Sequence, residues 1–435
     1  MSALGATLLL FAIFLLLLFL SVPISVAILT SSLLTMLLYL PWDQATFIAM
    51  QKMNNGVDSF SLLAVPLFIL AGNIMNNGGI ARRLIRFAQL LVGRVPGSLA
   101  QTNVMGNMLF GALSGSAVAA AAAIGGTLHP MEEEEGYDPA FAASVNVASA
   151  PTGLLIPPTA ALIVYSTIAG GVSISALFMA GYVPGILMGL VVMAIAFFHA
   201  RKHKYPTSSR VRGQEAWKIT LDAIPSLLLI VVVIGGIVGG VFTATEGAGV
   251  AVVYCLVLSM LYRSMSMQSF MSVLLRSTAT SGIILFLISA SSAMSWVMAY
   301  TGIPGAISQA MLTLTSSSTI ILLLMLVVLL VVGTFMDITP AILIFTPIFL
   351  PIATDLGMDP VHFGIVLIFT MCIGTMTPPV GSVLFVGCSV SQVRIESVIR
   401  YLVPYLLGLI LMLLVVAYVP VLSTGIPSLM GLMGS

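Results

Sequence analysis

The sequence has little charge. Only 7% of its 435 residues are charged, whereas a soluble domain carries about 25%. The 15 basic and 14 acidic residues leave a net charge of +1. This composition excludes a cytosolic enzyme, a secreted disulfide scaffold and a disordered chain. Because it provides no basic field, we expect no nucleic-acid partner.

Cysteines and catalytic motifs are also scarce. Cys255, Cys372 and Cys388 stand far apart in apolar segments and form no C-x-x-C pair, which argues against a disulfide framework or a metal site. We interpret all three as packing residues. The chain has no Walker A sequence, no H-E-x-x-H and no G-x-S-x-G. We therefore expect neither ATP-driven transport by this chain alone nor an enzyme.

The sequence does have long apolar runs. Hydrophobic residues make up 59% of the chain, and the mean hydropathy is +1.16. A transmembrane helix needs about 20 apolar residues. The pattern predicts an all-α polytopic membrane protein whose ten crossings cover 6–21, 24–41, 61–78, 139–170, 174–199, 221–242, 246–262, 279–300, 361–392 and 402–424.

Four segments have unusual lengths. Residues 97–128 turn at Gly111–Ser116, and residues 318–353 turn at Gly333–Asp337. The legs of the first hairpin span only about 20 Å of helix, and those of the second are slightly longer, so we predict two re-entrant hairpins. In contrast, 139–170 and 361–392 are too long for one straight helix and carry glycine and proline in their middles. We predict that each is a pair of half-helices.

These anomalies form one pattern that occurs twice. A shift of 221 residues brings 130–158 onto 351–379 with 8 identities in 29 positions. Weak internal similarity of this kind is typical of transporter repeats. The first predicted unit, 1–220, holds scaffold spans within 1–78, hairpin 97–128, broken helix 139–170 and span 174–199. The second, 221–435, holds scaffold spans 221–262 and 279–300, hairpin 318–353, broken helix 361–392 and final span 402–424.

The distribution of basic residues indicates that the two units are inverted. Arg82, Arg83, Arg86 and Arg94 follow Gly79, whereas the second unit has no basic residue between Gly302 and Arg394. The positive-inside rule predicts this difference for loops on opposite sides of a membrane. With the N-terminus outside, 14 of 15 basic residues become cytoplasmic, Lys52 being the exception, and the C-terminus also lies outside. Inverted repeats with hairpins and broken helices are typical of secondary transporters.

Polar residues at the turns and breaks are candidate ligands for a cation or an anion. The first tip offers Ser114 and Ser116, and the break in the same unit offers Thr152 and Gly153. The second unit offers Thr334, Asp337, Gly374, Thr375 and Thr377. Small-residue packing is the alternative for the first tip, and a helix N-cap is the alternative for Asp337. Half-helix carbonyls at membrane depth suit Na⁺, and free N–H groups suit an anion.

Other polar residues are expected to serve structure. Thr245 is interpreted as an N-cap with Glu246 in the first helical turn, a role in coupling being the alternative for Glu246, and Glu132–Glu135 as a solvated loop face. We find no Lys or Arg within a membrane segment. An anionic substrate would therefore be balanced by helix N-termini, hydroxyls and bound cations.

The chain resembles the large membrane subunit of tripartite ATP-independent periplasmic (TRAP) transporters. The matching motifs are Gly111–Ser116, Ser149–Thr159, Thr243–Gly247, Gly333–Pro340 and Gly374–Pro379. The resemblance implies an elevator-type, sodium-coupled importer of an organic acid in a bacterial inner membrane, with periplasmic termini. It also implies two protein partners, namely a small four-helix membrane subunit and a soluble periplasmic substrate-binding protein.

The resemblance also implies roles for individual residues. Ser114, Ser116, Thr152 and Gly153 would form one Na⁺ site, and Thr334, Asp337, Gly374 and Thr377 a second. The substrate would lie between the tips, near Ser116, Pro157, Asp337 and Pro378. At least two Na⁺ per monoanion are needed for a favourable electrogenic cycle. A stand-alone divalent-anion/sodium symporter, a passive pore and a membrane scaffold are the alternatives, and the substrate stays open among C4-dicarboxylates, sialic acid, keto acids and sugar acids.

Overall fold

The computed structural model describes residues 3–207, 213–315 and 317–433, and within them the regular structure is entirely helical. Arg210 and Arg212, which entered the charge argument, lie outside the described residues. The helices of the first half are α1 (Ala3–Phe19), α2 (Ile24–Met36), α3 (Trp42–Val57), η1 (Phe60–Leu63), α4 (Ala64–Asn77), α5 (Ile80–Val92), α6 (Ser98–Ser114), α7 (Ala117–Glu134), α8 (Pro139–Ser149), α9 (Thr152–Leu155), α10 (Ala160–Ile168) and α11 (Ile174–His203). Those of the second half are α12 (Gly213–Val238), α13 (Ala244–Leu261), α14 (Met267–Thr301), α15 (Ile303–Leu314), α16 (Ser318–Gly333), α17 (Ile338–Asp355), α18 (Pro360–Gly374), α19 (Ser382–Val390), α20 (Ile395–Tyr418) and α21 (Val421–Leu429).

Within the described residues, seven helical segments are long and apolar enough to cross a membrane. They comprise η1 with α4, α11, α12, α13, α14, α17 and α20. The pair formed by α8–α9 and α10 passes the same test together and bends by 48° at its break, within the segment 139–170 for which two half-helices were predicted. In 361–392, α18 ends at Gly374 and α19 begins at Ser382, so the helix is interrupted where the second break was predicted.

Some predicted spans differ in length. The span expected at 24–41 is a helix of 13 residues, which rises about 20 Å, because the helix ends at Met36 and Pro41 precedes a new helix, α3. The span expected at 279–300 begins earlier, at Met267, where Ser266 accepts a hydrogen bond from the Ser269 N–H at 3.1 Å. The helices α3, α5, α15 and α21 were not predicted.

The turn before α13 corrects the predicted cap. Thr243, and not Thr245, is the N-cap residue, because its hydroxyl accepts from the Glu246 N–H at 3.2 Å while the Glu246 carboxylate accepts from the Thr243 N–H at 2.8 Å. Thr245 donates instead to the carbonyl of Phe60 at 2.8 Å and links α13 to η1, which directly precedes α4. The structural role expected for Glu246 is confirmed.

The helices follow the 221-residue offset found in the sequence. Shifting α7 by 221 residues gives 338–355, which is the range of α17. Asp138 and Asp359 both accept hydrogen bonds from the two N–H groups that begin the next helix, and both Pro157–Pro158 and Pro378–Pro379 are joined by cis peptides. The duplication therefore extends from residues to caps and helix bounds.

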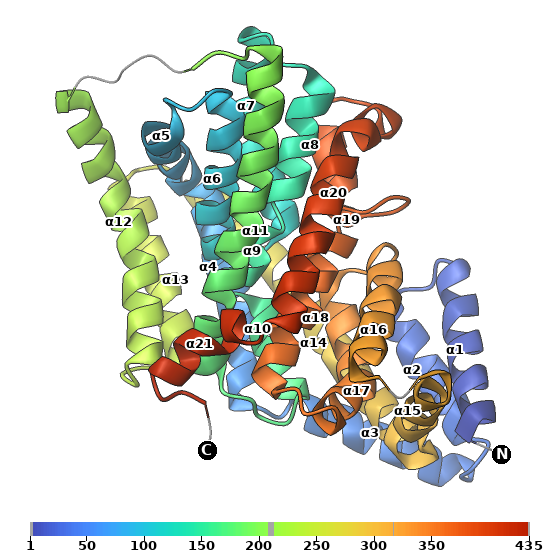
Figure 1. Ribbon diagram of the computed structural model, residues 1–435. Coiled ribbons are helices and arrows are strands. Elements are labelled where there is room, and N and C mark those ends of the chain that lie inside the picture. Colours follow the sequence, from blue (N-terminus) through green and yellow to red (C-terminus); the bar gives the residue numbers. More distant parts are fainter. Residues whose placement is uncertain (1–2, 208–212, 316, 434–435) are drawn as a thin grey trace.

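The two hairpins lie toward opposite ends of the molecule. In Figure 1, α5, α7 and α8 lie near the top, whereas α15, α16 and α17 lie toward the bottom right. The two units also interlock, because α7 contacts α19, α10 contacts α17 and α9 contacts α18. Cys255, Cys372 and Cys388 are free thiols buried in this helical core, as expected of packing residues.

Candidate functional site

The first hairpin turns within three residues. After Ser114, Gly115 adopts a left-handed conformation (φ 62°), which favours glycine, and its N–H donates to the Gly111 carbonyl at 2.8 Å. Ser116 then caps α7, because its hydroxyl accepts from the Ala119 N–H at 3.2 Å. Ser114 and Ser116 are partly exposed. The tip therefore keeps polar atoms at the end of both apolar legs.

The second tip carries a carboxylate in place of the serine. Asp337, equivalent to Ser116, occupies the N-cap position of α17 but makes no side-chain capping hydrogen bond. Its side chain is exposed. Asp337 therefore holds the N-cap position expected of it without the capping hydrogen bond, and its carboxylate lies beside the Ile338 N–H and the Ser382 hydroxyl at the cavity wall.

A glycine pair joins each hairpin to its broken helix. Gly111 crosses Gly153 so closely that a Cβ added at Gly111 would lie 2.6 Å from the Gly153 Cα. The same crossing recurs in the second unit, where a Cβ added at Gly374 would lie 2.5 Å from the Gly333 Cα. Real Cβ atoms almost never approach so closely. Each hairpin and its broken helix therefore contact through backbone and form one packed body.

Both tips open onto a single cavity of about 270 Å³. Of the predicted site residues, Ser114, Ser116, Asp337 and Thr375 line it. Ser382 of the second break lies beside them, next to the Asp337 carboxylate. The structure thus brings together tip residues that are more than 200 positions apart in the chain.

Seven other predicted site residues do not line this cavity, namely Thr152, Gly153, Pro157, Thr334, Gly374, Thr377 and Pro378. The three threonine hydroxyls donate within their own helices or turns, to the carbonyls of Ser149, Val331 and Ile373 at 2.6, 2.7 and 2.6 Å. Gly153 and Gly374 serve the helix crossings described above. Pro158, the neighbour of Pro157, does line the cavity.

Sequence reasoning missed four polar residues of the cavity wall. Thr339 lies in the first turn of α17 and Ser382 begins α19, while Asn73 of α4 and Thr280 of α14 face the tips from the surrounding helices. Asn73 also donates to the Ser277 hydroxyl at 2.9 Å and so links α4 to α14. Of these residues, Asn73 could have been identified from the sequence, because an asparagine in the middle of an apolar span is costly in a membrane and is usually functional.

A buried polar network was also missed, and it occurs in the first unit. The amide nitrogen of Asn107 lies 2.8 Å from Asn103 Oδ1, 3.0 Å from Asn146 Oδ1 and 2.8 Å from Ser149 Oγ. Asn103 in turn donates to Glu132 at 3.3 Å. The positions equivalent to Asn103, Asn107 and Asn146 are Leu324, Val328 and Leu367. The two hairpin bodies therefore have the same shape but different interiors.

Glu132 departs from the solvated loop that was predicted. Glu132 lies in the last turn of α7, after the apolar part of that helix. Its side chain is 2% exposed, whereas Glu133, Glu134 and Glu135 are exposed. Burial raises the pKa of Glu132 to about 7, although the Asn103 amide opposes the shift by donating to the carboxylate. The interior of the first unit therefore contains a group that titrates near neutral pH.

The sequence matches one protein family over nearly its whole length. Residues 11–422 match the tripartite ATP-independent periplasmic transporter, DctM component. The chain is 39% identical to the C4-dicarboxylate TRAP transporter large permease protein DctM of Pseudomonas aeruginosa, covering 92% of this chain and 94% of that protein. It is 34% identical to the sialic acid TRAP transporter large permease protein SiaM of Vibrio cholerae, over 88% and 89% of the two chains.

Two further similarities bear on the fold and the degree of relatedness. The chain is 51% identical to the uncharacterized protein YgiK of Salmonella typhimurium, over 97% of each chain. The crystal structure of the Alcanivorax borkumensis YdaH transporter aligns with a TM-score of 0.58 at 16% identity, covering 84% of this chain and 86% of that one, and so shares the fold. From the full-length family match and these relatives, the chain belongs to the family of large membrane subunits of TRAP transporters.

Proposed function

We propose that this chain imports an organic acid across the bacterial inner membrane by sodium-coupled, elevator-type transport. Its TRAP relatives are named as permeases, among them proteins for C4-dicarboxylates and for sialic acid. The observation that carries the proposal is the cavity where two hairpin tips meet, with Asp337 and the hydroxyls of Ser114 and Ser116 in its wall.

The donor atoms at the tips suit Na⁺. Discontinuous helices in transporters coordinate Na⁺ through unwound carbonyls and half-helix C-terminal ends. We propose one Na⁺ at the first tip and break, formed by Ser114, Ser116, Thr152 and Gly153, and a second formed by Thr334, Asp337, Gly374 and Thr377. In support of this grouping, the Gly381 N–H donates to the Thr334 carbonyl at 3.1 Å, so the second tip and the second break are already joined.

Sodium would also balance the charge of the substrate. Among the residues that the structure describes, no Lys or Arg lines the cavity. We propose that a carboxylate binds between Ser116 and Asp337, near Pro157 and Pro378, after Na⁺ has neutralised the site. Import of one negative charge is opposed by about 2.3 kcal/mol per 100 mV of membrane potential. At least two Na⁺ per monoanion then make the cycle electrogenic in the favourable direction.

The movement we propose follows from the packing. Each hairpin and its broken helix are joined at a glycine pair, and the two bodies interlock through α7 with α19 and α10 with α17. These elements would move as one transport domain against α1–α4 and α12–α14. A small four-helix membrane subunit would extend that scaffold, and a soluble periplasmic binding protein would deliver the substrate. Both partners follow from membership of the family.

The test is uptake into proteoliposomes. The chain is reconstituted with its small subunit and binding protein, and a panel of radiolabelled organic acids is supplied under an inward Na⁺ gradient. We expect saturable, Na⁺-dependent accumulation that Asp337→Asn abolishes, because the variant removes the carboxylate of the second proposed cation site. Asp355→Asn, which changes an exposed carboxylate in the last turn of the same helix, is the matched control.

Two outcomes would contradict the proposal. Uptake by Asp337→Asn at the parental rate and Na⁺ dependence would remove Asp337 from the cation site. Equal uptake in the absence of the binding protein would favour the stand-alone divalent-anion/sodium symporter.

A further inference from the structure

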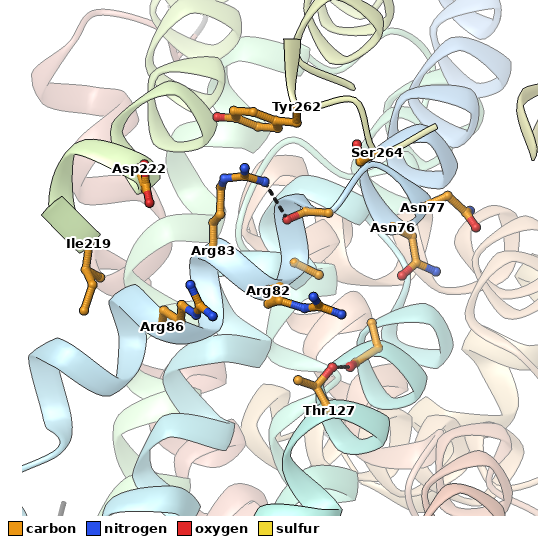
Figure 2. Close-up of a pocket in the computed structure, with 13 residues that line it drawn as sticks. Asn76, Asn77, Arg82, Arg83, Arg86, Thr127, Ile219, Asp222, Tyr262 and Ser264 are labelled. Atoms are coloured by element: carbon orange, nitrogen blue, oxygen red, sulfur yellow. Dashed lines mark hydrogen bonds between the residues drawn. The ribbon is translucent and has the colours of Figure 1, made fainter. Parts of the chain in front are cut away.

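A second cavity, of about 600 Å³, lies where α4, α5, α7 and α12 approach one another. Arg82, Arg83 and Arg86 of α5 point toward it in Figure 2, with Thr127 and Tyr262 on other walls. Asp222 is the one carboxylate in the described lining, so three guanidinium groups face a single negative charge. This cavity is separate in its lining residues from the one at the hairpin tips.

The stability of α5 does not explain these arginines. They lie in the first two turns of the helix, which has no acidic residue in its first turn. The N-terminus of a helix is the positive end of its dipole and favours acidic side chains by about 0.3–1 kcal/mol each. Arg82 and Arg83, in the first turn, are therefore unfavourable for α5, and together with Arg86 they concentrate positive charge on the cavity.

The three side chains are arranged differently. Arg83 is held in place, since its Nη1 donates to the Gly79 carbonyl at 3.2 Å and its Cζ lies 3.5 Å from the centre of the Tyr262 ring. Arg82 and Arg86 are exposed, and in the described part of the chain neither has a hydrogen bond or an ion pair with a protein group. The cavity therefore combines one fixed guanidinium with two that are available to a ligand.

The cavity lined by the three arginines (the arginine cavity) and the cavity at the hairpin tips (the tip cavity) are both lined by α4 and α7. They lie at successive positions along these two helices. On α4, Asn73 faces the tips and Asn77, one turn later, faces the arginines. On α7, Ala119 lines the tip cavity, and Ala123 and Thr127 line the arginine cavity on the next two turns. The spacing from Ala119 to Thr127 corresponds to about 12 Å of helix.

We propose that Arg82, Arg83 and Arg86 form a second binding site, for a small carboxylate, on the route between the hairpin tips and the side of the membrane where α5 lies. The inference rests on the proposed function for the identity of the acid. At the tips the anion depends on Na⁺ for charge balance, whereas at this second site the protein supplies the charge. An acid leaving the tips after Na⁺ dissociates would bind here before it reaches bulk water.

The test measures protection of the arginines in the absence of Na⁺. The full chain in phosphatidylcholine nanodiscs is treated with phenylglyoxal in Na⁺-free buffer, with and without succinate, and modification is quantified by mass spectrometry. At a succinate concentration three times its Kd, we expect about fourfold slower modification of Arg82 and Arg86, because the free fraction falls by that factor. Arg400, which is exposed and outside the cavity, should be unaffected.

Variants distinguish binding from a structural role. In Na⁺-free buffer, Arg82→Gln with Arg86→Gln should abolish the rise in melting temperature produced by succinate. The unliganded melting temperature should not fall, since the change removes positive charge from a helix N-terminus. Arg94→Gln, beyond the other end of α5, is the matched control and should keep the succinate effect.

Three outcomes would overturn the proposal. Protection that requires Na⁺ would place succinate at the tips alone. Protection by phosphatidylglycerol nanodiscs, with no further effect of succinate, would identify a lipid headgroup site. Equal modification rates in all conditions would show that no anion binds. None of these results depends on measuring uptake, so the binding proposal and the proposed transport function are tested independently.

Discussion

At the scale of single residues, the two units differ most at Glu132. The equivalent residue in the second unit is Ala353, so the buried carboxylate has no counterpart there. A buried carboxylate is costly when ionised. Its one described side-chain partner is Asn103, at 3.3 Å. Glu132 therefore makes the stability of the first hairpin body depend on pH.

The pH dependence has a definite sign. The pKa of Glu132 is raised from 4.5 to about 7, so the folded state holds the proton more tightly than the unfolded state does. Ionisation costs nothing below pH 4.5, grows as the pH rises toward 7 and then stays constant, amounting to about 3 kcal/mol. We expect Glu132→Gln to raise the melting temperature at pH 8 and to leave it nearly unchanged at pH 4.5.

Thermal unfolding of the purified chain across this pH range checks the prediction. Glu133→Gln, which changes an exposed neighbour, should follow the parent at every pH. If Glu132→Gln lost stability equally at pH 4.5 and pH 8, the carboxylate would instead be stabilising in its ionised form.

The polar residues at the tips and breaks show which site residues could be predicted from the sequence and which could not. Ser114, Ser116 and Asp337 could be predicted because polar residues at a turn inside an apolar segment are costly unless they bind something. Thr152, Thr334 and Thr377 have the same signal, but their hydroxyls donate to carbonyls three or four residues earlier. Sequence does not separate these cases, because any Ser or Thr hydroxyl near the end of a helix can donate to a carbonyl three or four residues earlier.

At the scale of elements, spans and breaks were more predictable than short helices. Long apolar runs and proline or glycine interruptions are local features, and they located α11, α20 and both broken helices. The helix α5 was missed because it is short and interrupted by three arginines, although its apolar residues Leu84 and Ile85 are buried. Its formation depends on packing against α6 and α12, which the local sequence does not contain.

The glycine crossings are the element-scale feature that holds each hairpin to its break. Replacing Gly111 with Ala places a Cβ 2.6 Å from the Gly153 Cα, and backbone cannot yield as a flexible side chain can. We expect Gly111→Ala to destabilise the protein by about 1–3 kcal/mol, as overpacking does. Denaturant or thermal unfolding of the purified variant measures the effect.

The matched control has the opposite expected sign. Gly249 lies inside α13 with nothing within 4 Å of an added Cβ. Helix propensity alone therefore favours Gly249→Ala by about 0.5–1 kcal/mol. Equal effects of the two substitutions would mean that the crossing of α6 and α9 is not tightly packed.

At the scale of the whole molecule, the proposed transport cycle depends on two units that enter the membrane from opposite sides. The repeat was visible in the sequence because Gly136, Asp138 and the paired prolines recur at the same spacing. The convergence of the two tips on one cavity was implied by the family resemblance and not by the residues alone, because it depends on how α10 meets α17 and α7 meets α19. A duplicated unit thus supplies two tips, and interlocking of the units places them together.

The orientation of the units can be measured directly by cysteine labelling. Arg94 follows α5 and Gln309 lies on the equivalent helix α15, and both side chains are exposed. The three native cysteines are buried, so the parent chain should give little background with a membrane-impermeant maleimide. In intact cells we expect Gln309→Cys to react and Arg94→Cys to react only after permeabilisation, because inversion places α5 in the cytoplasm and α15 outside. Labelling of both from the same side would make the repeats parallel. The tips could then not open alternately to the two sides, and the elevator cycle would lose its structural basis even though the cavity remained.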